Sequence, residues 1–361
     1  MREYDINLIN ILSKNVKTTT YNESEVFIKP IPEYLNSDGI LDPRELEMAK
    51  KTLANRLKNT SNKNIESMRE HSLHDTADLC DKEVIKETIN LKYKKHEFKV
   101  FSYHLPGGFD DKPCVIFIHG GSFFAGGAIN TENPMRFLAQ ESNAIVFNIE
   151  YGLAPENPYP IALKEILKTY KYIIHNSKRL HIDKNKIVIG GASSGANFAA
   201  VIANKLTNKR IALQVLYYPV VYLGLDVTPF VWDINEYKIS KEYENYIIPR
   251  LNLGRADEKG DQSYIRYIFK LYNPKNIDVH KKEFSPINAN LSKTPRTLIF
   301  TAEYDGLRIQ AEYYSSLLKQ HNIDVNTYRY NGIHHGFLNK FGLYPQAEDS
   351  LLIFADMIKK L

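Results

Sequence analysis

The sequence predicts an α/β fold, in which helices cover both faces of a mostly parallel central sheet. Two observations predict this fold, and a third indicates where it is interrupted. Short apolar segments recur from residue 115 onward, and segments with helical spacing separate most of them. One of them, 187–189, runs into Gly190-Gly191-Ala192-Ser193-Ser194-Gly195, a pattern typical of a strand, a sharp turn and a helix. A long tyrosine-rich stretch, 220–284, interrupts the alternation and indicates an insertion.

The first 83 residues are polar and rich in Asn, Lys and Glu. This segment contains one predicted helix start, because Asp42 is suited to cap a helix and Pro43 to occupy its first position. We expect that helix over 44–56, and we expect residues 1–83 to contribute to a lid. Residues 87–93 and 96–104 then alternate polar and apolar side chains around Lys94-Lys95, which predicts a β-hairpin.

The rest of the chain supplies the core of the fold. Continuous apolar segments of this kind are buried on both faces of a parallel sheet. The expected strands are 115–118, 144–149, 187–189, 213–217, 297–302 and 325–330, and the expected helices are 134–140, 160–174, 195–206, 309–320 and 347–361. Residues 84–219 and 285–361 then form two parts of one core, and 220–284 forms a lid insertion.

Composition narrows the class of protein. The formal charge of +5 is spread along the chain, so the basic pI does not indicate nucleic-acid binding. Of the two cysteines, Cys80 and Cys114, the second opens an apolar strand, so we expect no disulfide and a reducing compartment. No signal-peptide pattern or run of roughly eighteen apolar residues occurs. We therefore expect a cytoplasmic monomer or homodimer without stable membrane association.

The segment Gly191-x-Ser193-x-Gly195 is the pattern of a nucleophile elbow. A turn this tight holds the serine in strained backbone geometry and lifts its hydroxyl clear of the sheet. The helix that follows aims its N-terminal N–H groups at whatever binds there. Ser193 is therefore the candidate nucleophile.

A second glycine motif, His119-Gly120-Gly121-Ser122, follows the strand 115–118. Adjacent glycines let the backbone approach a ligand and turn its N–H groups inward. Acyl transfer needs such donors because negative charge builds on the carbonyl oxygen in the transition state. Alone, the motif could equally be a plain turn, but a nucleophile elbow two strands later favours the catalytic interpretation.

A serine hydroxyl needs a base, and the base needs an orienting carboxylate. Of the eleven histidines, seven, including His96, lie in polar or surface-like segments, whereas His335 follows the strand 325–330. Glu303 and Asp305 both follow the strand 297–302, and either acid fits. The order Ser193, Asp305, His335 is the order expected when a nucleophile elbow lies on such a sheet.

Over about residues 85–361 the chain resembles the hormone-sensitive-lipase-like branch of the α/β-hydrolase superfamily, which includes bacterial acetyl esterases and carboxylesterases. Five landmarks carry the resemblance, and all occur in the right order. They are His119-Gly120-Gly121, the tract from Glu150-Tyr151-Gly152-Leu153-Ala154-Pro155 to Tyr159-Pro160, Gly191-Ala192-Ser193-Ser194-Gly195-Ala196-Asn197, Ser285-Pro286, and Asp305 with His335-Gly336-Phe337.

The resemblance implies a role for each site residue. Ser193 would be the nucleophile, His335 the base, and Asp305 rather than Glu303 the orienting acid. The backbone N–H groups that form the oxyanion hole would be those of Gly120, Gly121 and Ser194. Residues 1–83 and the insertion would together form the lid over the acyl and alcohol pockets.

Three positions depart from the family pattern. Ala192 replaces the usual acid before the nucleophile, Ser122 replaces a third glycine, and Gly152 replaces the usual arginine after the tyrosine. None of them removes a catalytic group, so we expect activity to survive. We expect the loss of the acid at Ala192 to alter how the nucleophile elbow is held in place.

We therefore expect a serine carboxylesterase that acts on small, short-acyl esters through an acyl-enzyme. No HExxH motif or cluster of histidines and carboxylates with ligand spacing occurs, so no metal or cofactor is expected. An amidase, formamidase or lactonase with the same triad is an open alternative. A non-catalytic ligand-binding member is less favoured because His335 is present, and a membrane-surface lipase because the insertion is rich in Tyr and charge.

Overall fold

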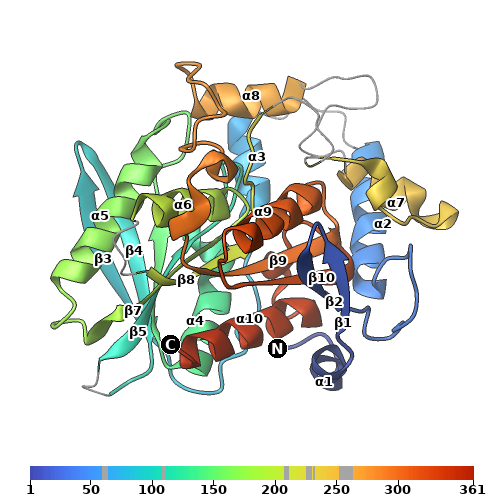
Figure 1. Cartoon of the computed structure of the whole chain (residues 1–361), viewed down its shortest axis with the longest axis horizontal. Coiled ribbons are helices and arrows are strands. Elements are labelled where there is room, and N and C mark those ends of the chain that lie inside the picture. The colour runs from blue at the N-terminus through green and yellow to red at the C-terminus, as the bar shows by residue number, and fades with distance from the viewer. Residues whose placement is uncertain (59–63, 108–110, 207–210, 225–229, 231, 252–262) are drawn as a thin grey trace.

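A computed structural model describes residues 1–361 except 59–63, 108–110, 207–210, 225–229, 231 and 252–262. Parts of the predicted insertion therefore lie outside the described residues. Strands and helices alternate along most of the described chain (Figure 1). The strands are β1 (Lys17–Tyr21), β2 (Ser24–Lys29), β3 (Ile85–Tyr93), β4 (His96–His104), β5 (Lys112–Ile118), β6 (Ile145–Glu150), β7 (Ile182–Ala192), β8 (Ile211–Tyr217), β9 (Arg296–Tyr304) and β10 (Val325–His334).

In the described part of the chain these strands form one ten-stranded sheet in the order β1-β2-β10-β9-β8-β7-β5-β6-β4-β3. The strands from β2 to β6 in this order are mutually parallel, while β1, β4 and β3 are antiparallel to their neighbours. The six predicted core strands and the predicted hairpin are all present. The mostly parallel sheet is confirmed.

The N-terminal segment contains two strands that the sequence does not predict. β1 and β2 form a hairpin, and β2 pairs in parallel with β10, with Val26 opposite Thr327. Part of the segment expected to contribute to a lid thus extends the central sheet. The sheet edge beyond β10 is covered by this hairpin.

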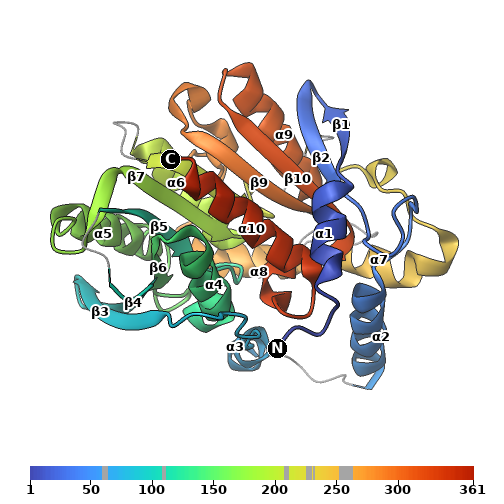
Figure 2. The same ribbon diagram turned by 90° about the horizontal axis from the view of Figure 1, so that it is seen from below.

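Helices pack on both faces of the sheet. One face carries α5 (Ile161–His175), α6 (Ser194–Lys205) and α9 (Arg308–Gln320), and the other carries α4 (Glu132–Ser142) and α10 (Pro345–Lys359). Seen from below, α10 crosses the sheet diagonally and α1 (Asn7–Lys14) lies beside it (Figure 2). Short 3₁₀ helices occur at Ala128–Thr131, Ile234–Glu236, Lys241–Tyr243, Pro286–Asn288, Leu291–Lys293 and Phe337–Lys340.

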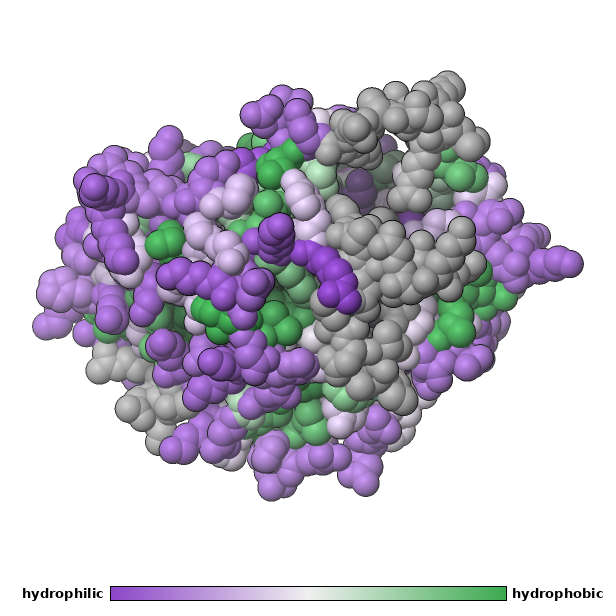
Figure 3. All heavy atoms as spheres, turned by 90° about the horizontal axis from the view of Figure 1, so that it is seen from above, coloured by the Kyte–Doolittle hydropathy of each residue, from purple (hydrophilic) through white to green (hydrophobic). Residues whose placement is uncertain are grey.

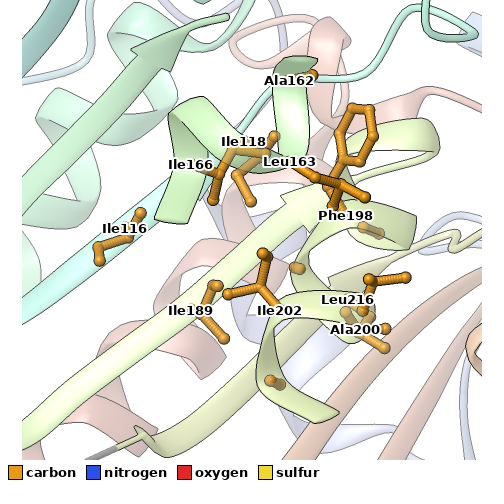
Figure 4. Close-up of a cluster of buried hydrophobic side chains, with 14 of the residues drawn as sticks. Ile116, Ile118, Ala162, Leu163, Ile166, Ile189, Phe198, Ala200, Ile202 and Leu216 are labelled. Carbon is orange, nitrogen blue, oxygen red and sulfur yellow. The ribbon is translucent and has the colours of Figure 1, made fainter. Parts of the chain in front are cut away.

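The central strands are apolar without alternation because both their faces are buried. On β5, Ile116 and Ile118 face one hydrophobic cluster, while Val115 and Phe117 face the other. The first cluster joins β5 and β7 to the apolar side of α6, including Phe198 (Figure 4). This packing fixes the start of α6, where the predicted nucleophile lies.

In the residues that the structure describes, four helices lie outside these two layers: α2 (Pro43–Lys58), α3 (Ile65–Ser72), α7 (Glu244–Leu251) and α8 (Ser263–Tyr272) (Figure 1). As predicted, α2 begins at Pro43, and the Asp42 carboxylate accepts a hydrogen bond from the Arg44 N–H at 3.0 Å. A small hydrophobic cluster that includes Leu41, Tyr304 and Ile247 packs α2 and α7 near the end of β9. Within the described ranges, no helix has the length and hydrophobicity needed to cross a membrane.

Candidate active site

Ser193 lies at the sharp turn between β7 and α6, with φ 55° and ψ −118°. A residue other than glycine adopts this conformation only when its surroundings enforce it. The Ser193 N–H donates to the Tyr217 carbonyl at 2.9 Å, and the Ser193 carbonyl accepts from the Asn197 N–H at 3.1 Å. A Cβ on Gly195 would lie 2.1 Å from the Ile118 carbonyl oxygen, so only glycine fits at this position of the turn.

The imidazole of His335 lies between Ser193 and Asp305. Its Nε2 is 2.9 Å from the Ser193 Oγ, and its Nδ1 is 2.7 Å from the Asp305 Oδ2. When Nδ1–H donates to the carboxylate, Nε2 is free to accept from the serine hydroxyl. The Asp305 side chain is buried, with 3% exposed, whereas 38% of the His335 side chain is exposed. The substrate side of the imidazole can therefore meet solvent.

Of the two acids that the sequence leaves open, Asp305 contacts His335 and Glu303 does not. The Asp305 Oδ1 also accepts from the Leu307 N–H at 2.8 Å. The Glu303 Oε2 accepts from the Gly332 N–H at 2.8 Å instead. Burial raises the pKa of Glu303 to about 7, although the backbone donor, Arg308 and Arg329 act to lower it.

The glycine motif after β5 lies against the elbow. A Cβ on Gly120 would come within 2.8 Å of the Ala192 carbonyl oxygen and 3.2 Å of the Ser193 Cβ. Gly121 has φ 133°, and Ser122 and Phe123 follow with φ 53° and 70°. The backbone of this loop and the N-terminus of α6 therefore meet beside Ser193, where N–H donors can serve an oxyanion.

Buried aromatic and imidazole side chains pack against this loop and against His335. The His119 ring stacks on Tyr151 with centroids 4.3 Å apart, and the Tyr151 hydroxyl donates to the His119 carbonyl at 3.0 Å. Burial lowers the pKa of His119, so its neutral ring can donate through Nδ1 to the Gly120 carbonyl, 2.8 Å away. The edge-on ring of Tyr218 lies 4.6 Å from that of His335. The sequence places Tyr151 in a family landmark without giving it a role, and Tyr218 carries no sequence signal.

A buried polar cluster surrounds His334, the residue before His335. Glu45 of α2 contacts the His334 Nδ1 at 3.0 Å, accepts from the Tyr344 hydroxyl at 3.0 Å, and pairs with Arg250 of α7. Burial alone would raise the pKa of Glu45, but His334 and Arg250 lower it to about 2. This cluster joins the N-terminal segment and the insertion to the end of β10.

At position 152, where this chain has glycine instead of the usual arginine, the side chain of His96 fills the neighbouring space. The Gly152 N–H donates to Glu165 Oε2 at 2.7 Å, and His96 Nδ1 lies 2.5 Å from Glu165 Oε1. A Cβ on Gly152 would lie 2.9 Å from the His96 ring. His96 therefore occupies space beside Gly152 and partners a buried carboxylate, a role that its polar sequence context does not indicate.

A serine elbow, an imidazole between that serine and a carboxylate, and a glycine loop beside them on a mostly parallel sheet define an α/β hydrolase. Among the described residues, no group of three or more His, Cys, Asp or Glu side chains is arranged to hold a metal ion. A family model described as alpha/beta hydrolase fold matches residues 115–339. The chain belongs to this family, in its hormone-sensitive-lipase-like branch.

Proteins similar to this chain include several esterases. An arylesterase of Saccharolobus solfataricus is 30% identical over 73% of this chain and 80% of its own length. Carboxylesterase NlhH of Mycobacterium tuberculosis is 28% identical over 67% of this chain and 71% of its own. Among solved structures, a hyperthermophilic esterase of Pyrobaculum calidifontis superposes with a TM-score of 0.73 at 27% identity, covering 89% of this chain and 98% of the esterase.

Proposed function

We propose that this chain is a serine carboxylesterase that hydrolyses small, short-acyl esters through Ser193, His335 and Asp305. The broader class, carboxylic ester hydrolase, follows from the family and from its esterase relatives. The observation that carries the proposed mechanism is the pair of contacts made by His335, 2.9 Å to the Ser193 Oγ and 2.7 Å to the Asp305 Oδ2.

In the proposed acylation step, the Ser193 oxygen attacks the ester carbonyl while His335 Nε2 takes its proton. Asp305 holds the productive tautomer and stabilises the imidazolium. The N–H groups of Gly120, Gly121 and Ser194 donate to the oxyanion. When the tetrahedral intermediate collapses, the bond to the alcohol oxygen breaks and His335 returns the proton to that oxygen.

Deacylation repeats the same steps with water. His335 takes a proton from the water as its oxygen attacks the acyl carbon, and the N–H donors again stabilise the oxyanion. Collapse releases the carboxylic acid and returns the proton to Ser193. The imidazole acts first as a base and then as an acid in each half, which the exposed ring of His335 permits.

A lid built from α2, α3, α7 and α8 is the second part of the proposal. Its support is a pair of contacts near the site. Tyr272 of α8 stacks on Phe123 of the glycine loop at 4.3 Å, and Arg250 of α7 pairs with Glu45 of α2, which contacts His334. Aromatic side chains in such a lid favour compact acyl groups.

The surface seen from above favours a water-soluble ester as the substrate, rather than a lipid in a membrane. Hydrophobic side chains on this face occur as separate groups among hydrophilic ones, over the coloured part of the surface (Figure 3). A helix that docks on a membrane would present a continuous hydrophobic face. We therefore propose a water-soluble ester as substrate.

The test is hydrolysis of p-nitrophenyl acetate by the wild type, Ser193→Ala and a control, Ser292→Ala, which changes an exposed serine. We expect Ser193→Ala to lose activity by roughly a thousandfold or more without unfolding, and the control to match the wild type. If the Ser193→Ala variant still hydrolysed the ester, the assignment of Ser193 as the nucleophile would be wrong.

A series of p-nitrophenyl esters from acetate to decanoate, with matched anilides and a lactone, tests the substrate class. We expect kcat/KM to be highest for the shortest acyl chains and the anilides to be poor substrates. Faster turnover of the anilides or of the lactone would favour the amidase or lactonase alternative with the same triad.

A further inference from the structure

We infer that Arg69 of α3 is a positioning residue, which holds the strained Gly120–Phe123 loop in the conformation that the oxyanion requires. The inference deepens the proposed function and rests on it. Arg69 lies in the N-terminal segment, outside the part of the chain that the family model matches. Arg69 is not among the contacts described above for Ser193 and His335. Any effect of Arg69 on catalysis would therefore be transmitted through the loop.

The loop needs external support because of its backbone. Gly121, Ser122 and Phe123 have φ values of 133°, 53° and 70° in succession. Glycine adopts positive φ freely, but serine and phenylalanine do so at a cost in free energy. Ser122 stands where the family resemblance leads us to expect a third glycine. The departure therefore places a strained residue beside the N–H groups that would serve the oxyanion.

Arg69 bridges this loop to a second one. Its Nε donates to the Phe124 carbonyl at 2.7 Å, and its Nη2 donates to the Ala154 carbonyl at 2.7 Å. The Ala154 N–H in turn donates to the Phe123 carbonyl at 3.1 Å. The planar guanidinium thus ties together the loops that follow β5 and β6, immediately after the strained residues.

Two further contacts hold α3 and its arginine in place. Glu156 accepts from Arg69 Nη1 at 3.0 Å and from Nη2 at 2.6 Å, which orients the guanidinium. Ser72, one turn further along α3, accepts from the Gly126 N–H at 2.9 Å through its Oγ. The helix therefore contacts the glycine loop at both Phe124 and Gly126.

Losing Arg69 should let the loop relax at Ser122 and Phe123, and the N–H groups of Gly120 and Gly121 would move with it. Those donors matter most when charge has developed on the oxygen, so binding of the transition state should suffer more than binding of the substrate. A purely structural role would instead lower stability without changing that balance.

The first experiment compares Arg69→Gln and Arg69→Lys with the wild type and with Arg179→Gln. Arg179 is an exposed arginine whose guanidinium donates to the Tyr172 hydroxyl. The readouts are kcat and KM for p-nitrophenyl acetate, the melting temperature, and the Ki of an alkyl trifluoromethyl ketone, whose hemiketal with Ser193 carries an oxyanion.

We expect Arg69→Gln to lower kcat by roughly tenfold to a hundredfold, less than the loss for a deleted oxyanion donor. KM should stay within about threefold, and the Ki should rise by about as much as kcat falls. Arg69→Lys keeps the charge beside Glu156 but cannot bridge two carbonyls with a planar fork, so it should show the same pattern. It also serves as the test if Arg69→Gln does not fold.

The second experiment asks whether strain at Ser122 creates the need for Arg69. In a Ser122→Gly background the loop can adopt its conformation with less support, so Arg69→Gln should cost at least about threefold less in kcat. If the two substitutions changed kcat independently, so that their effects multiplied, the proposed link between strain at Ser122 and the need for Arg69 would be wrong.

The outcomes separate the two proposals. Folded Arg69 variants whose kcat and Ki stay within about twofold of an active wild type would overturn the inference alone, as would a fall in kcat with an unchanged Ki. A wild type that neither hydrolyses the ester nor reacts with a fluorophosphonate at Ser193 would instead overturn the proposed function.

Discussion

Glu303 offers the sharpest test of the electrostatics around the site. Its carboxyl lies two residues before Asp305, accepts a hydrogen bond from Gly332, and has a pKa raised by burial to about 7 from an ordinary value of 4.5. Between these two pH values the folded protein binds a proton that the unfolded chain has lost. The stability linked to this proton is therefore complete below pH 4.5 and is lost as the pH rises through 7.

The size of the effect follows from the two pKa values. At about 1.4 kcal/mol for each pH unit, the interval from 4.5 to about 7 corresponds to at most about 3 kcal/mol. Part of the Glu303 side chain is exposed to solvent, so screening reduces this to about 1 to 2 kcal/mol. Glu303→Gln removes the titration but keeps an oxygen that can accept from the Gly332 N–H.

The assay is urea unfolding of the wild type and Glu303→Gln between pH 5 and 8, followed by the fluorescence of Trp232, the single tryptophan. The free energy of unfolding of the variant should rise by about 1 to 2 kcal/mol relative to that of the wild type across this pH range. Glu97→Gln, a control at an exposed glutamate on strand β4, should show no such gain. A difference that is the same at every pH would show that Glu303 ionises normally in the folded protein.

Three further changes test the site and its support. Asp305→Asn should lower kcat about ten-thousandfold by favouring the wrong tautomer of the catalytic imidazole, whereas Glu303→Gln should remain near wild type in p-nitrophenyl acetate hydrolysis; the reverse order would contradict the assignment. Glu45→Gln should cost about 2 to 4 kcal/mol in urea unfolding at pH 7, and the difference should shrink as the pH falls from 4.5 toward 2, where the wild-type carboxylate is protonated; a constant difference would exclude the lowered pKa. Phe198→Ala should cost about 3 to 5 kcal/mol in the same assay, because the ring is fully buried against Phe123; a smaller cost would indicate that the core collapses into the space.

The core of the fold is predictable because its strands are buried on both faces. A continuous apolar run such as 115–118 is typical of such a strand and too short for an ordinary helix, and β5 covers Lys112–Ile118. The hairpin of β1 and β2 carries no such signal. Every residue of β1 except Tyr21 is exposed, and three successive threonines show no alternation of polar and apolar side chains.

The candidate site is predictable to the extent that topology brings its residues together. Ser193, Asp305 and His335 each follow a strand of a parallel sheet, and the carboxyl ends of such strands meet at one edge. The choice between Glu303 and Asp305 depends on where the chain leaves β9, which ends at Tyr304. Arg69 carries no sequence signal at all, because its partners, two backbone carbonyls and the Glu156 carboxylate, are distant along the chain.

The pairing of β2 with β10 bears on how the protein matures during synthesis. β2 is synthesised long before its parallel partner β10, which ends at His334. The hairpin of β1 and β2 therefore cannot add to the sheet until β10 has been synthesised. The strand that leads into His335 is thus also the one that holds the hairpin, so a nascent chain halted before residue 325 would lack both the pairing partner of β2 and His335 itself.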